Sequence, residues 1–371
     1  MADNNKRLLS LDALRGFDMF FIMGLASFIC AVCGLFPEGG DCALARNMSH
    51  VQWDGLRHHD TIFPLFLFIA GISFPFSYAK QISSGTSRGR IYCKIFRRGI
   101  VLVLLGLVYN GLFNLDFENL RVASVLGRIG LAWMFAALLF INFNKVTRAV
   151  IAAVILIGYY LVIRFIPAPD VYGGDPLSID ANFAGYFDRL FLPGRLLYNH
   201  GNFDPEGLFS TLPAIVTAML GMFTGEFVRS EKKGLTGGRK SLYLALSGLV
   251  MLGIGLLWSL DFPINKKLWS SSFVLVVGAY SVLMFALFYY IIDVKGHTKW
   301  TLPFKVVGMN SITIYLAQRI IGFRKISDFF FSGVAQMCPE EWARLIDSTG
   351  YLLVSWLFLY FLYRKKIFLK V

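Results

Sequence analysis

Apolar residues in this sequence occur in long runs that charged residues interrupt at nearly regular intervals. A helix needs about 20 apolar residues to cross a hydrocarbon layer about 30 Å thick, and most of the runs approach this length. We therefore predict an all-α, polytopic integral membrane helical bundle with about ten transmembrane helices, folded as a single transmembrane domain over residues 1–371. The runs cover residues 17–35, 62–78, 100–115, 122–141, 149–166, 208–228, 242–260, 271–292, 306–321 and 351–363.

The distribution of charge sets the orientation that we expect for this bundle. If the N-terminus is inside, 23 of the 36 Lys and Arg residues fall on the inner side and 12 on the outer side. Cytoplasmic loops carry the excess of Lys and Arg, so we predict that the N- and C-termini are both cytoplasmic. The same loops account for the net charge of +13, and no nucleic acid partner is expected.

The longest loops lie on the predicted outer side, at residues 37–60, 167–207 and 322–350. Binding and catalytic residues gather on long, ordered loops, so we expect the functional face to be external. Of the five cysteines, Cys42 and Cys338 both fall on this side, and the sequence leaves open whether they pair.

One segment of the first outer loop concentrates groups suited to acid–base chemistry. Residues 49–60 hold three of the five histidines and two carboxylates, Asp54 and Asp60. A histidine can take a proton from a nucleophile at neutral pH, and a nearby carboxylate can fix its tautomer. Ordinary surface histidines are one rival interpretation and a metal site is another, but no matching ligand pair recurs elsewhere, so no metal is expected. The rival metal ligands are His50, His58, His59 and Asp60.

Basic residues on the inner side form a second group of interest. They suit either lipid headgroups or a phosphorylated cytoplasmic ligand, because Arg and Lys pair well with phosphate oxygens. Arg15 lies three residues after Asp12 on one helical face, where the two can pair with each other or bind a ligand. The densest basic stretch, residues 80–98, contains Lys94, Arg97 and Arg98.

Several further polar or aromatic residues lie at the ends of the apolar runs or inside them. Glu206 either faces a shared outer cavity or belongs to a helix start that Asp204 caps near Pro205. Trp53 and Trp269 can stack on a sugar or anchor the chain at the membrane interface. Asn310, in an apolar run, can bond to a neighbouring helix or stabilise a developing oxyanion.

Five stretches, each weak alone, together resemble the heparan-α-glucosaminide N-acetyltransferase family over essentially the whole chain. The stretches are Arg7 to Gly16, His50 to Leu56 continuing through Asp60 and Phe63-Pro64, Asp204 to Leu208, Asn265 to Trp269, and Gly308 to Ile312.

The resemblance implies transfer of an acetyl group from cytoplasmic acetyl-CoA to the amine of a terminal glucosamine-type sugar on the extracytoplasmic side. The family's catalytic histidine falls on His50, and the carboxylate ten residues later falls on Asp60. His50 then acts either as a general base or as an acetyl carrier. The expected acetyl-CoA residues are Arg15, Lys94, Arg97 and Arg98, and the expected substrate-binding residues are Trp53, Asp54, Glu206, Trp269 and Asn310.

The family has bacterial members, so the expected location is the bacterial inner (cytoplasmic) membrane, with membrane lipid as a further partner. The oligomeric state stays open, a homodimer included. One alternative is an acyltransferase for another periplasmic glycan or lipid acceptor. The other is a proton-coupled solute transporter in which His50 and Asp60 relay protons, but a transporter should show inverted internal repeats and we find no convincing repeat.

Overall fold

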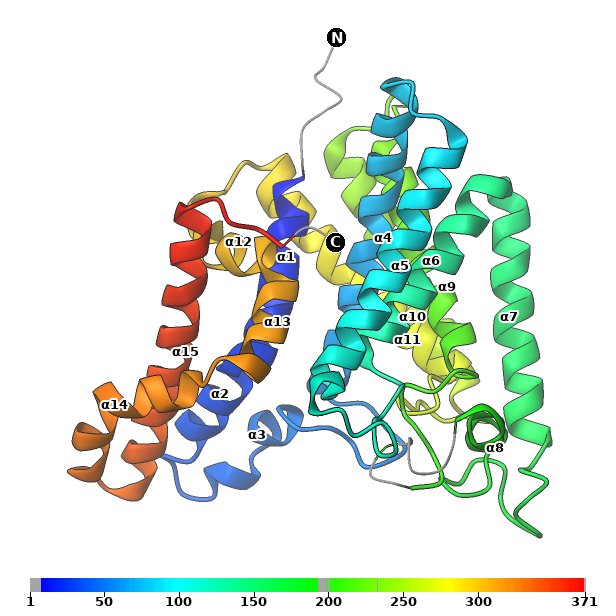
Figure 1. The fold of residues 1–371 in the computed structure, drawn as a ribbon. Coiled ribbons are helices and arrows are strands. Elements are labelled where there is room, and N and C mark those ends of the chain that lie inside the picture. The colour runs from blue at the N-terminus through cyan, green and yellow to red at the C-terminus, as the bar shows by residue number, and fades with distance from the viewer. Residues whose placement is uncertain (1–7, 193–197, 199–200, 232, 370–371) are drawn as a thin grey trace.

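The regular structure of the chain is helical (Figure 1), in a computed structural model that describes residues 8–192, 198, 201–231 and 233–369. Within these residues the β-structure amounts to an isolated bridge between Pro167 and Asn182. Eight of the described helices are long and apolar enough to cross a membrane, which confirms the predicted helical membrane bundle. They are α1 with η1 and α2 (Leu9–Cys33), α4 (His58–Ser83), α6 (Val125–Asn142), α7 (Lys145–Phe165), α9 (Thr211–Arg229), α10 (Gly237–Trp258), α11 with η6 (Ser271–Val294) and α15 (Glu340–Arg364).

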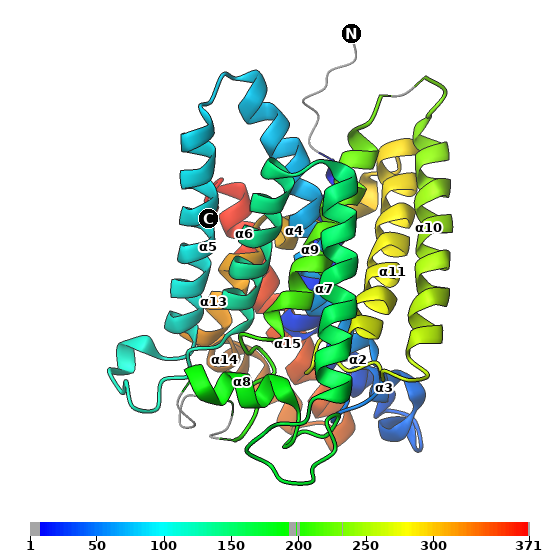
Figure 2. The ribbon, with the colours of Figure 1, turned by 90° about the vertical axis from the view of Figure 1, so that its right-hand side faces the viewer.

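Two predicted crossings take a different form. The run at residues 100–115 belongs to α5 (Arg88–Tyr109), whose first turns are basic and which runs beside α6 (Figure 2). The run at 306–321 is divided into α12 (Leu302–Met309) and α13 (Ser311–Ile320), because the backbone leaves the helical conformation at Asn310. With these two segments added to the eight, a total of about ten crossings stays a prediction.

The two ends of the bundle carry different connections. The start of α1 (Leu9–Phe20), the end of α15 and the turn between α4 and α5 lie at one end, here called the inner end (Figure 1). The short helices α3 (Ala43–Asn47), α8 (Phe183–Phe191) and α14 (Phe323–Gln336) lie at the opposite, outer end. Residues 1–7 and 370–371, and with them Arg7, lie outside the described residues, so cytoplasmic termini stay a prediction.

The first span is interrupted near its middle. After α1 the chain forms a π-helical stretch, η1 (Phe21–Leu25), and continues as α2 (Ala26–Cys33). Gly24 has φ 134°, a left-handed value that residues with a Cβ avoid, so glycine is what allows the irregular turn here.

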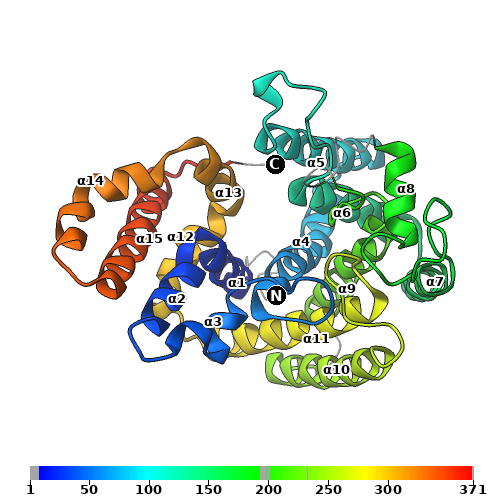
Figure 3. The ribbon, with the colours of Figure 1, turned by 90° about the horizontal axis from the view of Figure 1, so that it is seen from below.

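Close contact between backbones fixes the helices that carry the candidate sites. A Cβ added at Gly71 of α4 or Gly221 of α9 would overlap a carbonyl group of the opposite helix. The same holds for Gly16 of α1 and Gly308 of α12, and small residues at such crossings let membrane helices gain van der Waals contact. Seen from the outer end, α1 lies beside α4 and α11, next to the group formed by α12 to α15 (Figure 3).

Candidate active site

The centre of the outer site is built around the first turn of α4. Asp60, the third residue of this helix, accepts the backbone N–H groups of Arg57 (3.2 Å) and Val51 (3.2 Å) with its Oδ2 atom. This arrangement satisfies N–H groups at the helix start and folds the preceding loop back over it. The loop then places Nδ1 of His50 2.7 Å from Oδ1 of Asp60. Asp60 is buried, whereas the His50 side chain is 52% exposed and can meet a substrate.

Lys266 joins this pair from the loop between α10 and α11. Its Nζ atom lies 3.0 Å from Nδ1 of His50 and 3.4 Å from Oδ1 of Asp60. The Lys266 ammonium can only donate, so it bonds to Nδ1 of His50 only when Nδ1 carries a lone pair and no proton. The bond from Nδ1 to Asp60 forms only when Nδ1 carries the proton. The two contacts therefore belong to two proton arrangements of one triad. Burial lowers the pKa of Lys266, although the charge of Asp60 opposes this effect.

The loops that carry His50 and Lys266 are joined by further hydrogen bonds. Asn265 donates its side-chain amide to Oδ1 of Asp54 (3.1 Å), and the N–H of Gly55 donates to the carbonyl of Ile264 (2.8 Å). Trp53 donates Nε1–H to the carbonyl of Leu177 (2.8 Å). Trp53 and Asp54, both expected to bind substrate, thus also fix the loop beside His50.

The two histidines that begin α4 have different surroundings. The ring of His59 lies 4.5 Å from that of His50, whereas Nε2 of His58 lies 3.3 Å from the hydroxyl of Tyr280 on α11. Within the described residues, the structure shows no group of three or more His, Cys, Asp or Glu side chains suited to hold a metal ion. All five cysteines, including Cys42 and Cys338, are free.

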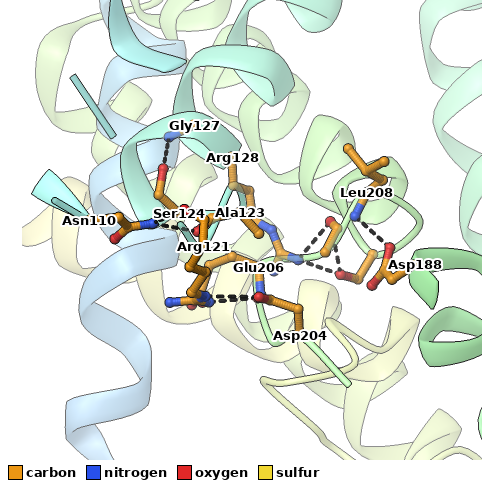
Figure 4. Close-up of polar contacts among 12 residues, drawn as sticks. Asn110, Arg121, Ala123, Ser124, Gly127, Arg128, Asp188, Asp204, Glu206 and Leu208 are labelled. Atoms are coloured by element: carbon orange, nitrogen blue, oxygen red, sulfur yellow. Dashed lines mark hydrogen bonds and ion pairs between the residues drawn. The ribbon is translucent and has the colours of Figure 1, made fainter. Parts of the chain in front are cut away.

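A second polar cluster at the outer end contains Glu206 (Figure 4). Arg121 forms a bidentate pair with the buried Asp204 (2.8 and 2.6 Å) and also pairs with Glu206. Burial opposes the charge of Arg121, but the two carboxylates outweigh it and raise its pKa. The suggestion that Asp204 caps a helix starting near Pro205 is wrong, because α9 begins only at Thr211. Oδ1 of Asp204 accepts the N–H of Glu206 (2.9 Å), but this bond stabilises a turn, and the same carboxylate pairs with Arg121.

Arg128, inside α6, connects this cluster to the core. Its guanidinium, which Figure 4 labels, donates to the carbonyl of Gly207 (3.2 Å) and to the hydroxyl of Ser210. It also lies 5.0 Å from the ring of Trp269. Trp269 is 1% exposed and donates Nε1–H to Thr217. In this conformation Trp269 lies beneath the outer site and has no open face on which a sugar could stack.

Asp188 and Asn310 both differ from the simple expectation, and Asn310 lies in the inner half of the bundle, next to Gly308, which packs on Asp12 near the start of α1. Asn310, at the break between α12 and α13, is buried, and its Oδ1 atom has no hydrogen-bond partner. Asp188 of α8 accepts the N–H groups of Leu208 (2.8 Å) and Phe209 (3.3 Å), and burial raises its pKa to about 7. Within the described part of the chain, neither Asn310 nor Asp188 forms a hydrogen bond with His50.

The predicted cytoplasmic ligand residues gather at the inner end. A cavity of about 620 Å³ between α4, α5 and α6 is lined by Lys94, Arg97 and Arg98. Arg15 approaches from α1 and donates to Ser73 (3.4 Å), which also lines the cavity. Its volume lies within the range of about 300–1,000 Å³ that is usual for ligand sites. Ser73 and Asp60 are thirteen residues apart on α4, about 20 Å along its axis.

A polytopic membrane protein with a histidine–carboxylate pair at one end and a basic cavity at the other has the layout of a transmembrane group-transfer enzyme. The family described as heparan-alpha-glucosaminide N-acetyltransferase, catalytic, matches residues 7–260, and the chain belongs to this family.

The curated relatives extend the similarity beyond that region. The chain is 27% identical over 377 residues to heparan-alpha-glucosaminide N-acetyltransferase of Homo sapiens, covering 87% of this chain and 55% of the relative. It is 27% identical over 376 residues to the Mus musculus protein of the same name, with 87% and 56% covered. The chain thus spans about half the length of the curated relatives it matches.

Proposed function

We propose that this chain is a transmembrane N-acetyltransferase that transfers an acetyl group from cytoplasmic acetyl-CoA to the amine of a terminal glucosamine-type sugar on the extracytoplasmic side. The observation that carries the proposal is the pairing of an exposed histidine with a buried carboxylate at one end of α4, and a basic cavity at the other end. In this proposal the membrane is the bacterial cytoplasmic membrane and the outer end faces away from the cytoplasm.

The inner cavity suits the phosphates of acetyl-CoA. Arg97 and Lys94 present cations at its wall, while Arg98 lies 4.2 Å from the ring of Trp133, which also lines the cavity. Arg15 would add a further cation from α1. With the phosphates held there, the pantetheine arm would extend along α4 toward the outer end, since about 20 Å separates Ser73 from Asp60.

His50 is the proposed base. When its Nδ1–H donates to Asp60, the other ring nitrogen, Nε2, carries the lone pair that takes a proton from the sugar ammonium or amine. The amine nitrogen then bonds to the thioester carbonyl carbon, the carbon–sulfur bond breaks, and the thiolate of CoA takes up a proton. In the alternative sequence, Nε2 itself is acetylated first and the amine then attacks the acetylimidazole.

The acceptor would lie between the His50 loop and the Arg121 cluster. Glu206 supplies a carboxylate for the sugar's ammonium or hydroxyl groups, and Trp53 and Asp54 border the loop. The charges of Glu206 and Lys266 lie close enough to interact, which supports one shared site for the two clusters. Trp269 would support this site from beneath. Asn310 lies beside the inner half of α1, so it is not assigned a contact with the acceptor.

The test is acetyl transfer from labelled acetyl-CoA to glucosamine by the purified protein in detergent. We expect transfer by the wild type and by His297→Ala, a matched change of an exposed histidine at the inner end, and loss of transfer by His50→Ala. Both variants should still bind acetyl-CoA. Retained transfer by a folded His50→Ala protein would remove His50 from the mechanism. A wild-type protein that neither binds acetyl-CoA nor transfers an acetyl group would refute the proposal that the chain is an acetyltransferase.

A further inference from the structure

A second cavity, of about 520 Å³, lies at the inner end beside the first span, and the proposed reaction does not use it. Its walls include three cationic side chains and one carboxylate, together with aromatic and apolar groups. The residues that matter for its chemistry are Asp12, Lys305, Tyr363, Arg364, Lys366 and Phe368.

The fold builds this cavity from segments that are far apart in sequence. Tight packing of Gly16 and Gly308 brings the start of α1 against α12, which carries Lys305. The chain turns back after α15 through Lys366, whose φ of 57° is left-handed, and the N–H of Ile367 bonds to the carbonyl of Leu362 (2.9 Å). The turn brings Lys366 and Phe368 to the same cavity wall (Figure 1 shows this segment leaving α15 toward α1).

The three cations of this cavity outnumber its one carboxylate. In the described part of the chain, no carboxylate lies within ion-pair distance of Lys305, Arg364 or Lys366. The carboxylate of Asp12 lies 3.9 Å from Arg15. Three cations around one already engaged carboxylate leave the cavity with a positive potential that an anion would neutralise.

The surface next to the cavity is strongly apolar. Phe361, Ile367 and Leu302 are 55%, 53% and 45% exposed. Only 22% of the apolar 18-residue stretch of α15 is buried inside the protein. An anion bound here would therefore have lipid-facing side chains beside it. A phosphate carried by two acyl chains fits both features, whereas a soluble nucleotide fits only the charge.

We propose that this second cavity binds the phosphate of an anionic phospholipid headgroup of the inner leaflet, with the acyl chains lying against Phe361 and Ile367. Lys305, Arg364 and Lys366 supply the charge. The proposal rests on the orientation given under the proposed function, in which the inner end faces the cytoplasm, and not on acetyl transfer.

The test is native mass spectrometry of the purified full chain after exchange into mixed micelles containing phosphatidylglycerol and phosphatidylcholine. We expect one phosphatidylglycerol to be retained in preference to phosphatidylcholine. In Arg364→Gln/Lys366→Gln its affinity should fall about thirtyfold, because each cation near an anionic lipid contributes roughly fivefold. Lys365→Gln removes a neighbouring charge that does not line the cavity, and it should bind as the wild type does.

Two outcomes would overturn the lipid site. One is a phosphatidylglycerol affinity that is equal in the double variant and the wild type, or that Lys365→Gln lowers as much as the double variant does. The cations of the cavity would then have no specific role beyond the overall positive charge. The other is displacement of the retained lipid by CoA, which would make a soluble nucleotide the occupant. Acetyl transfer is measured separately on the same samples, so a protein that retains the lipid but transfers no acetyl group would refute the proposed function alone.

Discussion

The Nδ1 atom of His50 lies 2.7 Å from Oδ1 of Asp60, and the same carboxylate bonds to two backbone N–H groups with its other oxygen. Asp60 therefore holds the loop and orients the imidazole at once. Separating these two roles requires a change that keeps the shape of the side chain and removes its charge.

Asp60→Asn is such a change. An asparagine oxygen can still accept from Val51 and Arg57, so we expect the loop to stay folded, while the ionised partner of His50 is lost. General acid–base catalysis contributes about 10²–10⁴-fold, and we expect kcat to fall by about a hundredfold or more. Steady-state kinetics with glucosamine measures this, and a melting temperature close to that of the wild type shows that folding is retained. Unchanged kcat would mean that the carboxylate charge has no part in the reaction.

Lys266 should influence the alkaline side of the pH–rate profile. Because burial lowers the pKa of Lys266, its cation is lost at a lower pH than that of an ordinary lysine, and its contact with Asp60 weakens as pH rises. We expect Lys266→Met to lower kcat/KM about tenfold. In Lys266→Arg the cation persists, so the fall in rate at alkaline pH should move to higher pH. Lys325 is an exposed lysine at the same end, and Lys325→Met should leave the pH–rate profile unchanged. Identical profiles for all three variants would exclude a role for Lys266.

The inner cavity allows a test that separates binding from chemistry. Arg97 lines the cavity, whereas Arg90 lies on the same helix, is exposed and does not line it. Arg97→Gln should raise KM for acetyl-CoA about tenfold, the usual worth of a hydrogen bond to a charged group, with little change in kcat. Arg90→Gln should change neither constant. If the two variants shift KM equally, the basic residues of α5 act only through their general charge.

Local patterns in the sequence predicted much of this arrangement, but contacts between distant residues were missed. The apolar runs predicted the spans, and the spacing of Lys94, Arg97 and Arg98 on one helix brought them to one cavity. Lys266 lies 216 residues from His50 in the sequence. It belongs to one of the stretches that resemble the family, but the sequence did not indicate that it contacts His50.

Two other features escaped prediction for physical reasons. Arg121 and Asp204 meet across 83 residues, so the aspartate looked like a helix cap until its partner was known. The run at 306–321 is mostly apolar, although it holds small polar residues and, near its end, Gln318 and Arg319. Hydropathy does not record that the backbone breaks at Asn310. Contacts that tertiary packing alone creates leave no periodic signal in the chain.

Asp188, on α8 at the outer end, should make the stability of the folded protein depend on pH. Its pKa is about 7 in the folded protein, above the value of about 3.9 in an unfolded chain, because burial disfavours the charge. Between about pH 4 and pH 7 the folded state therefore holds a proton that the unfolded state has lost, and stability falls as pH rises through this window. Asp188→Asn should flatten this dependence and raise the melting temperature above pH 7 by a few degrees. Melting curves from pH 5 to 8 compare the two proteins; parallel curves would show that Asp188 does not titrate there.

The contact between α1 and α12 gives a prediction that links packing to ligand binding. A Cβ at Gly308 would overlap the carbonyl of Asp12, so Gly308→Ala must push α1 away from α12. Overpacking of this kind costs about 1–3 kcal/mol, and we expect a lower melting temperature. Gly158 of α7 has open space around its missing Cβ, so Gly158→Ala should not destabilise the protein. Because α1 also carries Arg15, displacement of this helix should raise KM for acetyl-CoA in Gly308→Ala. If Gly308→Ala and Gly158→Ala melt alike, α1 and α12 do not pack as closely in the membrane as they do here.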